Sequence, residues 1–162
     1  MPVGNVPSLD GSCGCKANTV GQGALQFPDK NANVVKTLTS TRFLDGPWGL
    51  TINEEKDFAQ VFVANVLSCK VTRADIRICE RDIHDPIKVP RKTQIESGYP
   101  RGCAGTASVA GLAGLAYDKE KDIPCVPSTE DNGIYAVRDA GFTKKDKGTG
   151  KVVVQLSISE RS

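Results

Sequence analysis

The sequence contains a single histidine, His84, among its 162 residues. Histidine-based metal sites, including those of metal-dependent lyases, need further ligands of this kind, so the sequence argues against them. A Ser-His-Asp set also cannot be assembled with any specificity around one histidine. His84 lies between Asp82 and Asp85, which would suit a general base or a metal ligand. We interpret it as a solvated loop residue.

The sequence also lacks a long apolar run and a strong charge of either sign. No stretch approaches the roughly 20 apolar residues of a membrane-spanning helix. Residues 1–22 have neither the basic nor the apolar region of a secretory signal. Acids and bases are interspersed and the formal net charge is +2, so neither nucleic acid nor a membrane is indicated as a partner. As it stands, the sequence predicts a soluble, cytoplasmic protein.

Metal-binding cysteine motifs are missing as well. The six cysteines include no C-x-x-C pair, the spacing typical of zinc sites. The closest two are Cys13 and Cys15, in a segment rich in glycine and serine. Because cytosolic disulfides are rare, we expect reduced thiols.

Helical periodicity is absent, and short β-prone runs separated by turn formers take its place. We expect a flexible leader over 1–22 and a single all-β domain over 23–162. A hairpin is predicted within 23–43, around the turn-forming letters PDKNAN. The all-β prediction includes antiparallel four-stranded meanders over 44–98 and 109–158.

The two meanders are predicted because one phrase occurs twice. GPWGLTIN at 46–53 returns as AGLAGLAYD at 110–118, and each phrase opens a series of four β-prone runs. These runs are WGLTI, VFVAN, VTRADI and KTQIES in the first series, and GLAYD, IPCVP, IYAVRD and KVVVQLSI in the second. A four-stranded meander repeated along a chain is the unit of a β-propeller blade.

The two series resemble the blades of bacterial NHL-type and YVTN-type β-propeller repeat proteins. The shared features are a G-P-x-G-L opening, an aliphatic second strand and an N-x-I-x-x third strand, over about residues 24–156. The resemblance implies an incomplete propeller of two to two and a half blades, since complete propellers have about 4 to 8. Pro124 and Pro127 depart from the pattern, because each removes a hydrogen-bond donor from the second strand. Related full-length proteins are often exported, unlike the cytoplasmic protein expected here.

An incomplete propeller has open blade faces, which favour association or aggregation. We therefore expect a non-catalytic propeller-type binding or assembly module that self-associates through these faces. In origin it would be a piece of a longer propeller protein. Two or three copies would close a ring. One alternative is a metal-dependent lyase-like or lactonase-like subunit whose site is completed by oligomerisation, with contributions from Asp45, Asp118 or His84. A decayed fragment without selected function is another, and a rearranged small β-sandwich or barrel is the alternative fold.

The candidate ligand-binding residues are Asp45, Trp48 and Asp118, all at predicted strand ends. Trp48 would stack on a ligand at the channel mouth or, as we favour, fill space between blades. The carboxylates, with Glu130 and Asp131, would bind Ca²⁺ or Mg²⁺ as in lactonase-like propellers or, as we favour, stabilise turns. No catalytic residue and no cofactor is assigned.

Two further groups of residues have a simpler interpretation. Four glycines punctuate the repeat, since they do not form a phosphate-binding G-x-G-x-x-G pattern: Gly46, Gly49, Gly111 and Gly114. Four lysines predict a solvated basic loop: Lys144, Lys145, Lys147 and Lys151.

Overall fold

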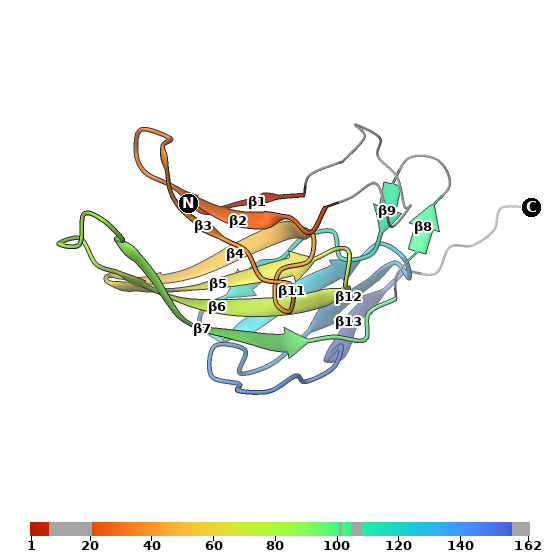
Figure 1. The fold of residues 1–162 in the computed structure, drawn as a ribbon. Coiled ribbons are helices and arrows are strands. Elements are labelled where there is room, and N and C mark those ends of the chain that lie inside the picture. The colour runs from red at the N-terminus through yellow and green to blue at the C-terminus, as the bar shows by residue number, and fades with distance from the viewer. Residues whose placement is uncertain (7–20, 101, 105–107, 157–162) are drawn as a thin grey trace, which may run out of the picture.

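The computed structural model describes residues 1–6, 21–100, 102–104 and 108–156, and within these ranges the chain is all-β with no helix. This confirms the predicted fold class. Apart from a two-stranded hairpin, the strands form three antiparallel sheets (Figure 1). In chain order the strands are β1 (Val3–Asn5), β2 (Ala24–Pro28), β3 (Val34–Leu38), β4 (Pro47–Glu55), β5 (Phe58–Asn65), β6 (Lys70–Ile78), β7 (Ile87–Glu96), β8 (Gly102–Ala104), β9 (Ser108–Ala110), β10 (Ala116–Asp118), β11 (Ile123–Ser128), β12 (Gly133–Ala136) and β13 (Lys151–Gln155).

The two predicted meanders are both present. The middle sheet has the strand order β4-β5-β6-β7, and the third sheet has the order β10-β11-β12-β13. Both lie inside the predicted ranges. No sheet in the described part of the chain closes into a barrel.

The first sheet has the order β1-β2-β3. Its hairpin turn is held by Asp29, whose Oδ1 accepts hydrogen bonds from the N–H groups of Asn31 (2.8 Å) and Asn33 (2.9 Å), a typical use of aspartate in turns. The short strand β1 comes from the segment expected to be a leader, and it pairs with β2. The rest of that expectation, residues 7–20, lies outside the described residues.

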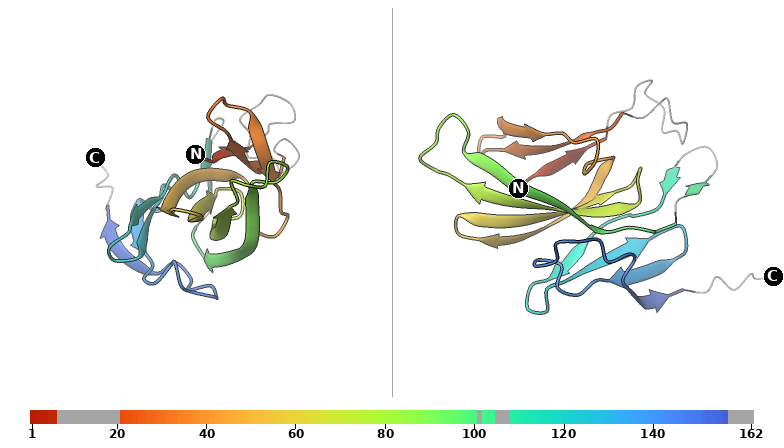
Figure 2. Two further views of the ribbon diagram at one scale, coloured as in Figure 1. Left: turned by 90° about the vertical axis from the view of Figure 1, so that its left-hand side faces the viewer. Right: turned by 60° about the horizontal axis from the view of Figure 1, so that its bottom comes forward.

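The three sheets stack face to face, with the middle sheet between the other two (Figure 2). Strand β5 is buried along both faces, which explains its continuous apolar run. Val61 and Val63 belong to the core shared with the first sheet. Phe62 and Ala64 belong to the core shared with the third sheet. The chain therefore has two apolar layers, one on each side of β5.

The first strand of each sheet lies beside the first strand of the next. A Cβ added at Gly4 in β1 would lie 2.3 Å from the carbonyl oxygen of Pro47 in β4. A Cβ added at Gly49 in β4 would lie 2.6 Å from the Cα of Gly114, just before β10. Real Cβ atoms do not approach this closely, so glycine allows the backbones to meet. The repeated glycines Gly49 and Gly114 thus mark the contact between two sheets.

Strand β11 forms despite its two prolines. It lies between β10 and β12, where a missing N–H is usually disfavoured. The carbonyls remain in use: that of Pro124 accepts from the Val137 N–H and that of Pro127 from the Ala113 N–H.

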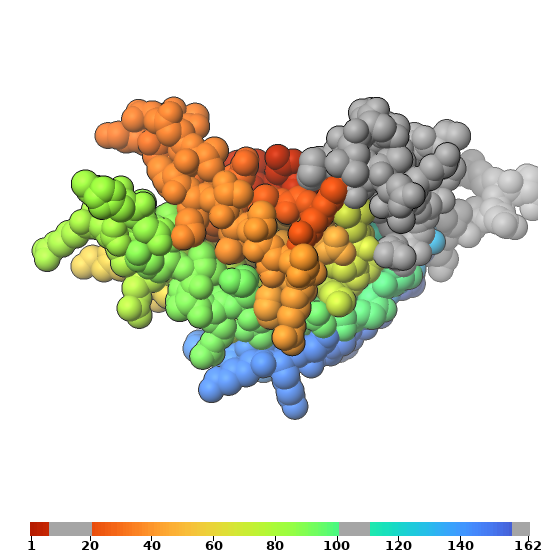
Figure 3. Space-filling model, in the orientation of Figure 1, coloured from red at the N-terminus to blue at the C-terminus, as the bar shows by residue number. Residues whose placement is uncertain are grey.

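Two long connections reach the exposed edge of the middle sheet at β7. They are the β3–β4 loop (residues 39–46) and the β12–β13 loop (residues 137–150). Figure 3 shows these segments, in light orange and blue, meeting the green β7 on one face of the molecule.

Candidate functional site

Asp45 and Trp48 lie where the chain enters β4. The Asp45 N–H donates to Oδ1 of Asn65 (2.9 Å), and the Asp45 carbonyl accepts from the N–H of Leu67 (3.3 Å). The backbone of Asp45 is therefore part of a turn. Trp48 is 64% exposed, so the expectation that it fills space between sheets is wrong. Its ring faces solvent, and a ligand-binding role for Asp45 and Trp48 stays a prediction.

Asp118 ends β10 and is engaged in its own turn. Its Oδ1 accepts from the Lys121 N–H (3.1 Å), and its Oδ2 pairs with the Lys121 ammonium (3.0 Å). The side-chain hydrogen bond from Lys121 holds the pKa of Asp118 below its ordinary value. The neighbouring Lys119 donates to the carbonyl of Glu54 (3.2 Å), near the end of β4. The length of β4, ~30 Å, therefore separates Asp118 from Asp45.

His84 is exposed in the loop between β6 and β7, as the solvated interpretation requires. The two flanking carboxylates are paired with lysines: Lys88 lies 2.8 Å from Asp82 and 3.1 Å from Asp85, and Lys36 lies 2.9 Å from Asp85. Hydrogen bonds from these lysines lower the pKa of both carboxyl groups. Asp85 thus ties the loop to the first sheet through Lys36, and Asp82 accepts a hydrogen bond from the backbone N–H of His84 (3.2 Å).

The remaining carboxylates and cysteines also gather into no metal site. Asp131 accepts a hydrogen bond from the Tyr135 hydroxyl, and Glu130 is exposed beside it. Cys79 and Cys125 form no disulfide with the described residues, and the reduced state of the cysteines stays a prediction. Within the described ranges, no three His, Cys, Asp or Glu side chains come close enough to hold a metal ion.

A buried polar cluster, not singled out from the sequence, joins the middle sheet to the β12–β13 loop. Arg73 is 2% exposed and its Nε lies 2.9 Å from Oδ1 of Asp75. Its Nη1 donates to the carbonyls of Ala140 (2.6 Å) and Thr143 (3.1 Å). Gln60 donates to Asp75 (3.3 Å) and to a third carbonyl of the loop (2.8 Å). We call Gln60, Arg73 and Asp75 the Arg73 cluster, and its contacts hold the loop in place.

Glu96, at the end of β7, is fully buried and accepts a hydrogen bond from the Tyr99 hydroxyl. The Tyr99 hydroxyl contacts Oε2 of Glu96 and lies 3.2 Å from the carbonyl of Thr149. The Tyr99 hydroxyl is the donor in both contacts, so its one proton is shared between the Glu96 carboxyl and the Thr149 carbonyl. Burial raises the pKa of the Glu96 carboxyl to about 8, so this carboxyl carries a proton at neutral pH. The other oxygen, Oε1, has no partner in the described part of the chain.

The proton of the Glu96 carboxyl makes the free energy of unfolding depend on pH. The folded chain keeps it to about pH 8, whereas an unfolded glutamate loses it near pH 4.5. Because the folded state binds more protons in this window, the free energy of unfolding should fall as the pH rises from 5 to 8. Glu96→Gln should remove this decrease in the free energy of unfolding. At pH 8 the substitution should therefore stabilise the protein by a few kcal/mol. Urea unfolding at both pH values measures it; the exposed Glu120→Gln is the control and should leave the pH dependence unchanged. Equal pH dependence in Glu96→Gln and the unchanged protein would contradict the assignment.

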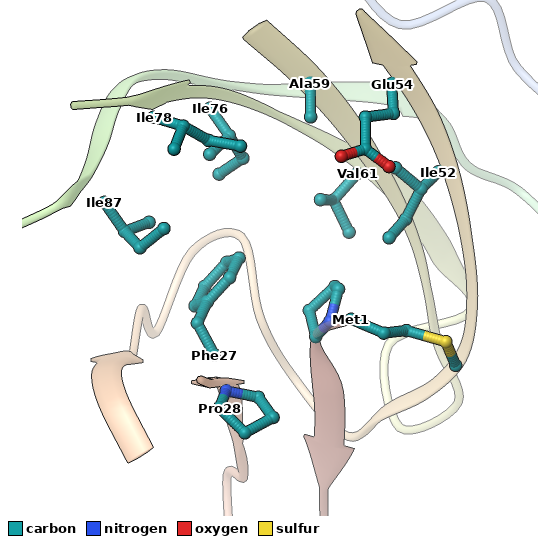
Figure 4. Close-up of a pocket in the computed structure, with 11 residues that line it drawn as sticks. Met1, Phe27, Pro28, Ile52, Glu54, Ala59, Val61, Ile76, Ile78 and Ile87 are labelled. Carbon is teal, nitrogen blue, oxygen red and sulfur yellow. The ribbon is translucent and has the colours of Figure 1, made fainter. Parts of the chain in front are cut away.

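A hollow lies between the first and middle sheets, beside the core that they share (Figure 4). It has a volume of about 230 Å³, and its walls are almost entirely aliphatic and aromatic side chains such as Phe27, Ile52 and Ile76. Glu54 is the only charged side chain that lines it.

Comparisons with protein-family models, with curated proteins and with solved structures found no match. In the ranges that the structure covers, no helix has the length and apolar character needed to cross a membrane.

Proposed function

We propose that the chain is a non-catalytic, propeller-type assembly module that associates with further copies of itself through the outer faces of its end sheets. The arrangement of the sheets supports this proposal. Each sheet is a meander, the sheets stack face to face, and their first strands are neighbours. Blades of a propeller are related in the same way.

The observation that carries the proposal is the apolar outer face of the third sheet. Val126 and Tyr135 point inward into the core, so the alternate side chains point outward. The outward side chains of β11, β12 and β13 include an apolar group, bordered by the charged Asp118 on β10 and Lys151 on β13; the apolar members are Ile123, Cys125, Pro127, Ile134, Ala136 and Val154. Ile134 and Val154 lie opposite each other and are both exposed. A contiguous apolar face of this kind is typical of an interaction surface.

The first sheet of a second copy is the partner that continues the existing stack. Leu25 and Phe27 of the first sheet point toward the middle sheet, so Gln26 and its cross-strand neighbours Val3 and Thr37 point outward. Packing this outer face against the outer face of the third sheet of another copy would reproduce the face-to-face packing that neighbouring sheets have within one chain. Two copies would provide six sheets, within the roughly 4 to 8 blades of closed propellers. The association is therefore head to tail.

The test is the solution mass of the protein by light scattering after size exclusion, under reducing conditions. We expect a discrete oligomer that Ile134→Lys converts to monomer, because a charge is placed in the interface. Ile83→Lys is the matched control, since Ile83 is exposed in the loop between β6 and β7, and it should leave the mass unchanged.

A second variant distinguishes head-to-tail packing from a contact between two third sheets. Val3→Lys, on the outer face of the first sheet, should also yield monomers in a head-to-tail ring. An oligomer sensitive to Ile134→Lys alone would contradict the ring, and a compact monomer at all concentrations would overturn the proposal. The lyase or lactonase alternative has no observation in its favour, because its three residues lie apart within one chain: Asp45 in the β3–β4 loop, His84 in the β6–β7 loop and Asp118 at the end of β10.

A further inference from the structure

Five basic side chains from three separate parts of the chain line one groove at the edge of the middle sheet. The groove has a volume of about 480 Å³. The β3–β4 loop contributes one cation, β7 contributes two and the β12–β13 loop contributes two; they are Arg42, Arg91, Lys92, Lys144 and Lys145. Only two of the four lysines of the predicted basic loop belong to this basic groove. Lys147 and Lys151 line a different hollow.

The positive charge of the basic groove is not neutralised by the protein. None of its five cations forms an ion pair or a side-chain hydrogen bond with the described residues, whereas other cations of the chain, such as Lys36, Lys88 and Lys121, are paired with carboxylates. The groove has one carboxylate, Asp146. That carboxylate accepts hydrogen bonds from Gln94, Ser97 and the N–H of Gly148. The groove therefore keeps an excess of four positive charges.

Both walls of the basic groove are anchored to the interior. The β3–β4 loop is held through the carbonyl of Phe43, which accepts from Thr72 Oγ1 (2.7 Å) and Asn65 Nδ2 (3.2 Å). The β12–β13 loop is held by Arg73 through two of its carbonyls. Anchored walls reduce the conformational entropy that a ligand must remove on binding.

We propose that the basic groove binds a small molecule carrying two or more phosphate groups. Guanidinium groups bind phosphate oxygens in pairs and ammonium groups bind them as point charges, and both kinds are present. A single phosphate would engage only part of a groove whose cations come from three segments. The volume lies within the range of about 300 to 1,000 Å³ typical of small-molecule sites.

A nucleic acid fits the basic groove less well than a compact polyphosphate. Its only aromatic side chain is Phe43, and the guanidinium of Arg42 lies over that ring at 5.2 Å. No open aromatic surface remains in the groove for a base to stack on. The net charge of the whole chain, +2, is also low for a polymer of phosphates.

Isothermal titration calorimetry at low salt with inorganic triphosphate as the probe tests the proposal. We expect triphosphate to bind at least tenfold more tightly than inorganic phosphate. Lys144→Gln combined with Lys145→Gln should weaken triphosphate binding at least tenfold. The matched control combines Lys30→Gln with Lys56→Gln, which removes the same charge from two exposed loop lysines and should change the affinity less than twofold.

Two outcomes would overturn the proposal. Equal weakening by the groove variant and the control would show attraction to the overall charge and not a site. Absence of triphosphate binding, together with groove-dependent binding of single-stranded RNA or of vesicles containing phosphatidylserine, would assign the groove to a macromolecule or a membrane.

A second variant, Arg91→Gln on strand β7, should also reduce the affinity for triphosphate. It should leave the oligomeric mass unchanged, because Arg91 is not on an outer sheet face.

Discussion

Gly49→Ala should lower the free energy of unfolding by about 3 kcal/mol. The added Cβ would lie 2.6 Å from the Cα and 2.8 Å from the carbonyl carbon of Gly114. Both are backbone atoms, so the clash cannot be relieved by a change of rotamer. The first strands of the middle and third sheets would have to separate. Urea unfolding followed by circular dichroism measures the loss.

Gly114→Ala is the matched control at the other side of the same contact. A Cβ there would meet only the Pro127 Cγ, at 3.9 Å, which is ordinary packing. We expect a change below about 1 kcal/mol. Equal losses in Gly49→Ala and Gly114→Ala would show that close approach of the strands is not the reason for the glycine at position 49.

Arg73→Met should be at least as damaging, with a loss of about 3 to 5 kcal/mol. The substitution leaves the Asp75 carboxylate buried without its charged partner. It also leaves the carbonyls of Ala140 and Thr143 without the donor that they share. We expect earlier unfolding in urea and faster amide hydrogen exchange in the β12–β13 loop, because the loop loses its anchor.

Arg77→Met, on the same strand but exposed, is the control and should change the free energy of unfolding by less than about 0.5 kcal/mol. Combining Arg73→Met with Asp75→Leu should recover part of the loss, because no buried charge is then left alone. A double variant less stable than Arg73→Met would contradict this account.

The strands were predictable from the sequence because their signals are local. Apolar runs such as VFVAN and the turn-forming letters between them appear in order in the structure as β2 to β7 and β10 to β13. Pro124 and Pro127 in IPCVP argued against a strand at β11, because each removes a hydrogen-bond donor. The strand nevertheless forms, since the carbonyls of Pro124 and Pro127 still accept hydrogen bonds.

The sites were not predictable to the same extent because they depend on contacts distant in sequence. The alternation in VTRADI suggests that Arg73 and Asp75 face solvent, but the β12–β13 loop covers them. Arg42 and Lys144 meet in the basic groove although about a hundred positions separate them. Trp48 was expected between the sheets, yet it is 64% exposed, and the neighbouring Gly49 lies at the contact between the first strands.

The Arg73 cluster has a consequence for how β5 finds its partners. A slip of β5 by one residue would exchange Val61 and Val63 with Phe62 and Ala64, and apolar side chains would still occupy both layers. The same slip would carry Gln60 into an aliphatic layer, away from Asp75 and the loop carbonyl that it contacts. Unpaired polar groups in such a layer are costly. The apolar residues of β5 alone would allow either alignment, and the Arg73 cluster favours the one that is observed.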